Sequence, residues 1–455
     1  MIPLTICKDR TLLVLGLGRS GRSTVAAALA GGARVIAWDD SAEARAEVCG
    51  AEISAPDQLD WSAIDMLVLA PGIPLTHPEP HPAVIAARDA GAEIIGDIEL
   101  FVRQMPQARI VAVTGTNGKS TTTAMIGHVL QSAGLDASVA GNIGVPVLEL
   151  EPGEPDRVHV LELSSYQIDL TPSIRPEVGI LLNISPDHLD RHGGMAGYVE
   201  VKRKLFAHMD TGCTAVIGID DRYGRDLVET LSGNPGLALR PIAVGRPRPG
   251  SGYVLEGRVV ADGLHIMDLS GHPTLPGKHN QQNVAAAVAA CLALGLGAAK
   301  IAAGIGSFPG LPHRIERLGE RDGVSFYNDS KATNPEAAAR ALASFERIYW
   351  IAGGVPKDGP LTPVLPFLDR VARTYLIGAA EARFAVELSG RTDCVPSGTL
   401  ARAVTQAAGD AQADGGGVVL LSPACASFDQ FANFEARGDA FRALVNDLLE
   451  AEAGS

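Results

Sequence analysis

The chain has 455 residues, of which 46% are hydrophobic and 20% are charged, a globular composition that excludes disorder, collagen and coiled coil as its main character. Its 38 Lys and Arg residues against 52 Asp and Glu residues give a net charge of −14, which argues against broad binding to nucleic acid or to an anionic membrane. The cysteines are scattered, so they indicate neither a disulfide framework nor a zinc site. No secretory signal or membrane-spanning run is visible, and we expect a cytoplasmic protein.

Short apolar runs that end in turn residues alternate with Ala-rich segments along the chain, which is the pattern of parallel α/β layers. The predicted strands are residues 11–15, 34–38, 66–70, 110–114, 159–163, 179–183, 348–352, 374–378 and 417–422. We expect a helix at 98–105, a small β excursion within 240–271 and a buried helix in the apolar stretch 284–299. The predicted domains are residues 1–97, 98–309 and 310–455, with a Pro/Gly-rich hinge or linker at 308–312.

The first glycine-rich loop, residues 16–21 (GLGRSG), fits the pattern G-x-G-x-x-G between a predicted strand and a helix. Asp39 and Asp40 end the next strand, at about the distance expected of a ribose contact. Such a loop presents backbone N–H groups to a pyrophosphate. Three interpretations stay open: a dinucleotide site, a site for a different diphosphate nucleotide, and a tight turn without a ligand.

The second glycine-rich loop, residues 115–121 (GTNGKST), follows a predicted strand and opens a helix. It resembles a P-loop, in which Lys119 would reach the β- and γ-phosphates and Ser120 or Thr121 would face Mg²⁺. Val113 stands where the general pattern has its first glycine, so a loop without function is the alternative. The loop favours an ATP-using enzyme over a dehydrogenase.

Two further side chains follow predicted strands. Glu162 would be costly to bury unpaired, so it is a candidate metal ligand; an ordinary carboxylate at a helix N-terminus is the alternative. His188 is a candidate ligand of a second cation or a phosphate contact, although a single histidine in a loop is more often neither.

These features together resemble the Mur ligase family of ATP-dependent amide-bond ligases, and the resemblance covers the whole chain. The GTNGKST loop is the family's own form, and matching blocks follow in order at 141–144, 162–165, 183–190, 277–283 and 311–314. Residues 328–334 and 421–438 are similar to blocks of the branch that adds D-glutamate. The Asp-Asn-Pro-Arg signature of the branch that adds diaminopimelate or lysine is absent.

The resemblance implies three α/β domains: a Rossmann-like UDP-binding domain, a P-loop mononucleotide-binding ATPase domain, and a Rossmann-like C-terminal domain that binds the amino acid. It implies an ATP-dependent ligase of peptidoglycan precursor synthesis, which joins the L-alanyl carboxylate of UDP-N-acetylmuramoyl-L-alanine to the amine of D-glutamate through an acyl phosphate. Its implied partners are these small molecules and ATP, with two Mg²⁺ sites. We expect a monomer that binds neither nucleic acid nor a membrane.

The resemblance also assigns roles by matching position. It implies UDP-substrate contacts at Gly18, Arg19, Ser20, Asp39, Gly72 and Asn142. It implies ATP contacts at Gly115, Thr116, Asn117, Gly118, Lys119, Ser120, Thr121, Asn280, Asn283, Arg314, Asp329 and Lys331. It implies D-glutamate contacts at Thr333, Lys357, Ser427 and Phe434. The implied catalytic residues are Lys119, Glu162, His188 and Lys202, and the implied Mg²⁺ ligands are Ser120, Glu162, His188 and Lys202.

Lys202 would act as a carbamate, whose anionic oxygen suits a hard cation. An exposed helix lysine is the alternative, and Lys204 lies nearby. Three rival functions are possible: a nicotinamide-dependent dehydrogenase, a folate polyglutamate-adding ligase of the same superfamily, and an ATP-binding regulatory or scaffolding protein. The first leaves the P-loop without a role, the second does not need the first domain, and the third leaves the catalytic set unexplained. The sequence does not name the base that deprotonates the amine.

Overall fold

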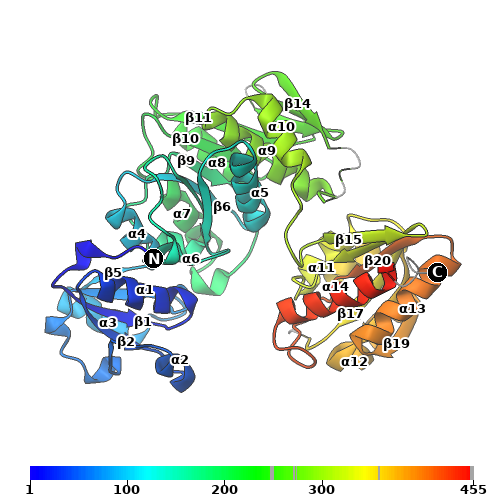
Figure 1. Ribbon diagram of the computed structural model, residues 1–455, viewed down its shortest axis with the longest axis horizontal. Coiled ribbons are helices and arrows are strands. Elements are labelled where there is room, and N and C mark those ends of the chain that lie inside the picture. The colour runs from blue at the N-terminus through cyan, green and yellow to red at the C-terminus, as the bar shows by residue number, and fades with distance from the viewer. Residues whose placement is uncertain (246–250, 270–271, 273, 357–358, 451–455) are drawn as a thin grey trace. The chain divides into compact units, whose positions relative to one another are not determined.

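The computed structural model of the chain describes residues 1–245, 251–269, 272, 274–356 and 359–450. These residues form two compact units (Figure 1), one of Met1–Ser270 with Gln281–Ser307 and one of Gly271–Asn280 with Phe308–Ser455. Two sheets lie in the first unit and a third sheet lies in the second. Among the described residues, no helix has the length and apolar character needed to cross a membrane.

The first sheet is parallel throughout, with the strand order β3-β2-β1-β4-β5. Its strands are β1 (Thr11–Leu15), β2 (Arg34–Trp38), β3 (Glu52–Ile53), β4 (Met66–Leu69) and β5 (Glu93–Ile95). Its helices are α1 (Arg19–Ala30), α2 (Ala42–Ala46) and α3 (Pro82–Ala90). The strand order changes direction at β1, so the first glycine loop lies where doubly wound sheets bind their ligands.

The second sheet has the order β14-β13-β12-β11-β10-β9-β6-β8-β7. Its strands are β6 (Arg109–Thr114), β7 (Ala137–Gly141), β8 (Val158–Glu162), β9 (Val178–Leu181), β10 (Thr214–Gly218), β11 (Ala238–Val244), β12 (Gly252–Leu255), β13 (Arg258–Ala261) and β14 (Leu264–Asp268). The last three form the predicted β excursion, with antiparallel pairing of β12 to β13 and β13 to β14.

The helices of this sheet are α5 (Lys119–Ser132), α6 (Ser165–Asp169), α7 (Met195–Arg203), α8 (Arg222–Leu231), α9 (Lys278–Ala293) and α10 (Ala298–Gly306). The predicted buried helix in the apolar stretch 284–299 is present as the second half of α9, and the end of the stretch belongs to α10. Gly295 lies between the two helices with φ of +86°, a left-handed conformation that ends α9.

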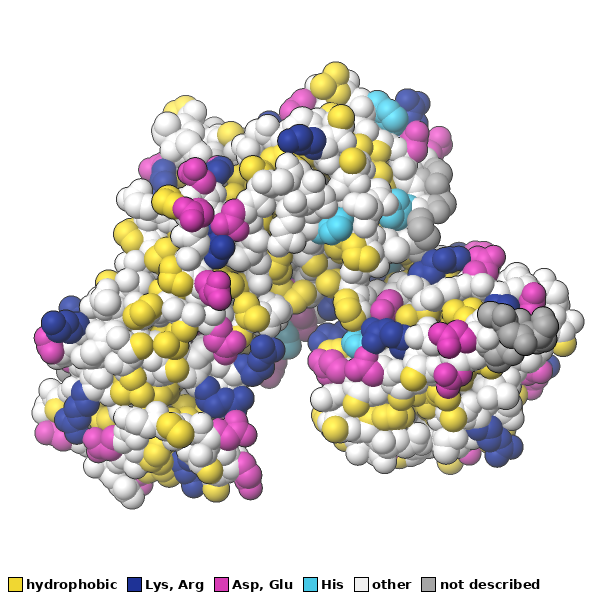
Figure 2. Space-filling model, in the orientation of Figure 1, with side chains coloured by type: hydrophobic (Ala, Val, Ile, Leu, Met, Phe, Trp, Pro, Cys, Tyr) yellow, Lys and Arg dark blue, Asp and Glu magenta, His cyan; other side chains and the backbone are white. Residues whose placement is uncertain are grey.

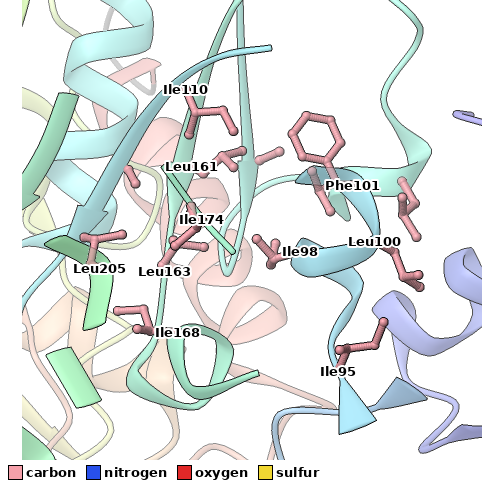
Figure 3. Close-up of a cluster of buried hydrophobic side chains, with 14 of the residues drawn as sticks. Ile95, Ile98, Leu100, Phe101, Ile110, Leu161, Leu163, Ile168, Ile174 and Leu205 are labelled. Atoms are coloured by element: carbon pink, nitrogen blue, oxygen red, sulfur yellow. The ribbon is translucent and has the colours of Figure 1, made fainter. Parts of the chain in front are cut away.

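Helix α4 (Asp97–Gln104) joins the first two sheets into one unit. Figure 3 shows Ile98 and Phe101 of this helix in the same buried cluster as Leu161 and Leu163 of the second sheet. The carboxylate of Glu99, which is fully buried, accepts hydrogen bonds from the backbone N–H and hydroxyl of Ser173 at 3.1 and 2.7 Å. Apolar burial and this polar contact together fix the first glycine loop relative to the P-loop.

The third sheet has the order β15-β16-β20-β17-β18-β19, and only the edge strand β15 is antiparallel to its neighbour among the described strands. Its strands are β15 (Glu316–Arg321), β16 (Val324–Asn328), β17 (Ile348–Gly353), β18 (Val371–Ile377), β19 (Cys394–Gly398) and β20 (Gly417–Leu421). Its helices are α11 (Pro335–Leu342), α12 (Glu381–Glu387), α13 (Leu400–Ala413) and α14 (Phe434–Glu450). Separate apolar clusters cover this sheet, as expected of strands buried on both faces.

All of the strands predicted from the sequence are present, and the α/β class is confirmed. The strands predicted at 11–15 and 34–38 have the observed bounds, whereas the one predicted at 374–378 begins earlier, at Val371. Acidic and basic side chains are interspersed over the face shown in Figure 2.

Candidate active site

The P-loop connects β6 to α5 and is held in place by the segment that follows the neighbouring strand β9. The backbone N–H of Thr116 donates to the Asn183 carbonyl at 2.8 Å, and that of Asn117 donates to Asn183 Oδ1 at 2.9 Å. Gly118 has φ of +85°, and a Cβ there would lie 2.2 Å from Asn283 Oδ1 of α9. Glycine is therefore favoured at this position, and Gly118 lies next to Asn283, a second residue predicted to contact ATP.

Two lysines converge on one carbonyl of this loop. Lys119 Nζ donates to the carbonyls of Gly115 and Thr116 at 3.1 and 3.0 Å. Lys202 Nζ, from α7, donates to the same Gly115 carbonyl at 2.9 Å and to the Thr114 hydroxyl at 3.3 Å. The amino groups of Lys119 from α5 and Lys202 from α7 thus meet at the Gly115 carbonyl.

Lys202 is 1% exposed, so the interpretation as an exposed helix lysine is wrong. Lys204, by contrast, donates to Asp169 at 2.6 Å in an exposed ion pair. Burial, and secondly the nearby charge of Lys119, lower the pKa of Lys202 to about 7. A large fraction of this amine is therefore neutral, and hence nucleophilic, near neutral pH.

Glu162 is the last residue of β8 and is buried. Its Oε1 accepts a hydrogen bond from Asn142 Nδ2 at 2.8 Å, while its Oε2 is buried without a partner. The adjacent helix α6 is capped by Ser164 instead, so the interpretation of Glu162 as an ordinary helix N-terminal carboxylate is wrong. A buried carboxylate oxygen without a donor needs a cation, and the donor set fits Mg²⁺.

His188 lies in a loop with φ of +50° and its side chain is about half-exposed. A series of aromatic rings leads from it toward Lys202: the ring centroids of His188 and Tyr166 are 5.3 Å apart, those of Tyr166 and His192 5.3 Å, and those of His192 and Tyr198 5.4 Å. Lys202 Nζ lies 4.8 Å from the Tyr198 ring centroid. The structure therefore links His188 and Lys202 through three rings that the sequence analysis missed.

Tyr166 and His192 carry a signal that was available, because each lies just beyond a block that matches the family, and Tyr198 lies four residues before Lys202. The described residues contain no group of three or more His, Cys, Asp or Glu side chains able to hold a metal ion.

The first glycine loop is held by the carboxylate of Asp39, which follows β2, and by close packing of its own glycines. Asp39 accepts hydrogen bonds from the backbone N–H of Leu17 at 2.7 Å and of Ser41 at 2.9 Å. A Cβ at Gly21 would lie 1.9 Å from the Gly16 carbonyl oxygen, so only glycine allows α1 to begin this close to the loop. Gly18 caps α1, and the predicted residues Arg19 and Ser20 form its first turn. Gly72 accepts a hydrogen bond from Arg191 at 3.0 Å.

In the second unit, the predicted residues gather around the carboxyl ends of β16 and β20. Asp329 is buried, and its carboxylate accepts from the Ile315 N–H at 3.2 Å and the Ser422 hydroxyl at 2.8 Å. Burial raises the pKa of Asp329 to about 7. Lys331 Nζ lies 3.9 Å from the Phe434 ring centroid.

Other residues predicted to bind ATP or D-glutamate lie near the ends of β16 and β20 or at the start of α9. Thr333 donates its backbone N–H to the Lys331 carbonyl at 2.8 Å. Ser427 is buried after β20. Asn280 Nδ2, in the first turn of α9, donates to the Pro276 carbonyl at 2.8 Å. Arg314 follows His313, whose φ of +61° lies in the left-handed region. Lys357 lies outside the described residues.

Comparison with known proteins identifies the family. Residues 113–291 match the Mur ligase middle domain, and residues 313–425 match the domain described as Mur ligase, glutamate ligase domain. The chain belongs to the Mur ligase family. The predicted resemblance is thereby confirmed over both matched domains.

Relatives of this Mur ligase match nearly its whole length. A protein from Brucella abortus (strain 2308) named UDP-N-acetylmuramoylalanine–D-glutamate ligase is 51% identical, over 98% of this chain and 97% of its own. Proteins of the same name from Rhizobium etli and Caulobacter vibrioides (strain NA1000 / CB15N) are 51% and 48% identical, over 97% and 98% of this chain and 96% and 98% of their own.

Solved structures share the fold of this Mur ligase at low sequence identity. The UDP-N-acetylmuramate–alanine ligase from Thermotoga maritima has a TM-score of 0.60 and 17% identity, covering 97% of this chain and 100% of its own. The MurF ligase from Thermotoga maritima, solved in complex with ADP, has a TM-score of 0.59 and 17% identity, covering 99% of this chain and 97% of its own. The predicted α/β architecture of the family is confirmed.

Proposed function

We propose that this Mur ligase joins the L-alanyl carboxylate of UDP-N-acetylmuramoyl-L-alanine to the amine of D-glutamate, with release of ADP and phosphate. The observation that carries the proposal is the 51% identity, over 98% of the chain, to a ligase named for this reaction. The P-loop with its two buried or half-buried lysines supports the use of ATP. The reaction is an amide-forming step of peptidoglycan precursor synthesis, and its use of ATP supports a cytoplasmic location.

In the proposed ATP site, the backbone N–H groups of residues 115–121 wrap the phosphates, and Lys119 moves from the Gly115 and Thr116 carbonyls to the β- and γ-phosphates. Asn283, which contacts the loop at Gly118, is a proposed adenine-side contact. The other proposed ATP contacts keep the roles implied by matching position: Asn280, Arg314, Asp329 and Lys331.

The residues that would hold two Mg²⁺ ions are Ser120, Glu162, His188 and Lys202 as its carbamate. The unpartnered Oε2 of Glu162 supports the first site. The burial of Lys202 supports the carbamate, because its neutral amine can attack CO₂ and lose a proton to give an anionic oxygen ligand. Bound Mg²⁺ would neutralise charge on the ATP phosphates during phosphoryl transfer.

The proposed reaction has two bond-forming steps. The substrate carboxylate attacks the γ-phosphorus of ATP, and ADP leaves to give an acyl phosphate. The amine of D-glutamate then attacks the acyl carbon, and phosphate leaves as the amide forms. The hydrogen bond from Asn142 to Glu162 at 2.8 Å supports a shared reaction centre, because it joins a proposed contact of the UDP substrate to a proposed metal ligand.

The proposed UDP site consists of the first glycine loop with Gly18, Arg19, Ser20, Asp39 and Gly72. Because Asp39 already accepts two backbone hydrogen bonds, we propose that its main role is to fix the conformation of the loop and that its contact with the ligand is secondary. The proposed D-glutamate pocket consists of Thr333, Lys357, Ser427 and Phe434. The domain bounds 1–97, 98–309 and 310–455 and a monomeric state remain part of the proposal.

The test is phosphate release from ATP and Mg²⁺ with UDP-N-acetylmuramoyl-L-alanine and one amino acid at a time: D-glutamate, L-glutamate, L-lysine or diaminopimelate. We expect release with D-glutamate alone and a product heavier by one glutamyl residue. Release with a different amino acid would retain the ligase and overturn the pocket. No release with any acceptor would overturn the proposed function.

A further inference from the structure

Arg437 is a fully buried cation to which the proposed mechanism assigns no role. It lies in the first turn of α14 and is 1% exposed. Its guanidinium donates to Ser330 at both the hydroxyl and the carbonyl (2.9 Å each), to the Cys425 carbonyl at 3.1 Å and to the Ala426 carbonyl at 3.4 Å. No carboxylate of the described residues forms an ion pair with it.

These hydrogen bonds connect three segments of the proposed amino-acid pocket. Ser330 belongs to the segment after β16 that carries Lys331 and Thr333, and Cys425 and Ala426 directly precede Ser427. The Ser330 hydroxyl also donates to the carbonyl of Phe434, the first residue of α14, at 2.8 Å. The guanidinium fork therefore holds the segments of Thr333, Ser427 and Phe434 in one arrangement.

The position is electrostatically unfavourable for a cation unless an anion binds nearby. A buried guanidinium loses its hydration, and carbonyl oxygens satisfy its N–H groups without neutralising its charge. The N-terminal turn of a helix adds further positive potential, and Lys331 lies 3.9 Å from the Phe434 ring centroid.

Among the described residues of the second unit, no carboxylate forms an ion pair with the guanidinium, although the negative charge of Asp429 acts on it and raises the pKa of Arg437. Burial raises the pKa of the adjacent Cys425 thiol to about 12, which keeps it neutral. Asp429 is exposed, and its carboxylate accepts from the Ala379 N–H at 2.9 Å. Glu435, in the same turn as Arg437, is also exposed. Burial lowers the pKa of Arg437 only to about 10, so the guanidinium stays charged at neutral pH.

We propose that Arg437 is the positioning residue of the amino-acid pocket, and that its buried charge, which forms no ion pair with a described carboxylate, makes the pocket select an amino acid with an acidic side chain. This inference rests on the proposed function and extends it to the origin of substrate preference. An incoming glutamate carries two carboxylates and completes the charge balance, whereas glutamine has nearly the same shape and one carboxylate fewer.

The test compares the full-length enzyme with R437M, R437K and the control R402M. Methionine approximates the length of the arginine side chain without its charge, lysine keeps the charge without the fork, and Arg402 is an exposed arginine of α13. KM and kcat are measured for D-glutamate and for ATP, and D-glutamine is tested both as acceptor and as competitor. Thermal unfolding of each variant reports on folding.

We expect R437M to lose about tenfold or more of its preference for D-glutamate over D-glutamine, with KM for ATP changed less than about threefold. R437K is expected to weaken binding of both amino acids while retaining most of the preference. R402M is expected to match the parent enzyme in every constant. A stability effect alone would lower active enzyme without changing the preference ratio.

The inference is overturned if R437M keeps the parent preference, or if R437K loses the preference as completely as R437M. Should R437M fail to fold, the R437K ratio decides alone: a fall of about tenfold refutes the charge argument, and retention supports it. A parent enzyme that does not use D-glutamate refutes the proposed function itself, which the parent assay reveals before any variant is compared.

Discussion

Replacing Glu162 by glutamine should stabilise the metal-free protein while abolishing ligation. The carboxylate is 2% exposed, and only Oε1 has a hydrogen bond, from Asn142 at 2.8 Å. Leaving a buried polar group unsatisfied costs about 1–3 kcal/mol, and more when the group is charged. Glutamine keeps the acceptor for Asn142 and removes the charge, so E162Q should gain about 1–3 kcal/mol in the free energy of unfolding without Mg²⁺.

The assay is urea unfolding with and without Mg²⁺ and ADP. Ligand at a hundred times its Kd stabilises a folded protein by about 2.7 kcal/mol, so the parent should gain on this order and E162Q should gain much less. E177Q is the matched control, because Glu177 is ion-paired with Arg109 at 2.8 Å; its loss should destabilise the protein and leave the Mg²⁺ response intact. If E162Q is less stable than the parent without Mg²⁺, or responds to Mg²⁺ as the parent does, the assignment of Glu162 as a metal ligand is refuted.

Three further predictions follow from groups whose surroundings are resolved. The pKa of Asp329 is raised to about 7, so the protonated side chain stabilises the folded state at low pH, and this stabilisation is lost as pH rises through about 7. The free energy of unfolding should therefore fall by up to about 4 kcal/mol between pH 4 and 8. D329N should remove this pH dependence, which urea unfolding at several pH values measures. K202A should abolish ligation and regain activity with an added short carboxylate, while K204A keeps most of its activity; full activity of K202A would refute the carbamate. G118A should weaken ATP binding and cost at least about 1–2 kcal/mol of stability, because its Cβ would meet Asn283 Oδ1 at 2.2 Å in a left-handed backbone; nucleotide titration and urea unfolding check both effects.

Many of the strands could be predicted where burial on both faces leaves a continuous apolar run, although the buried strand β10 was missed. Residues 66–69 and 348–353 are buried throughout and were found with little error. The edge strand β15 (Glu316–Arg321) was missed because four of its six residues are charged, and the short β3 was missed because both of its residues are exposed. Strand β18 was started too late because Arg373 interrupts its apolar run.

In the candidate site too, features set by neighbouring residues could be predicted, whereas features set by distant segments could not. The P-loop could be predicted because its residues are contiguous and each has a local reason, such as the backbone of Gly118. The burial of Lys202 and the hydrogen bonds of Arg437 could not, because both depend on segments that are far apart in the sequence. Nothing local to α14 indicates that Ser330, more than a hundred residues earlier, lies at 2.9 Å from Arg437.

The Gly115 carbonyl gives an electrostatic reason for modifying Lys202. Lys119 and Lys202 donate to this one oxygen at 3.1 and 2.9 Å, so two like charges share a partially buried acceptor. Burial, and secondly this repulsion, lower the pKa of Lys202, the more buried of the two, and so favour loss of its proton. A carbamate there would change the local charge by two and turn repulsion of Lys119 into attraction. The burial that disfavours the charged form of Lys202 thus makes its neutral amine a good nucleophile toward CO₂. Formation of the proposed metal ligand therefore depends on the packing of α7 against the P-loop.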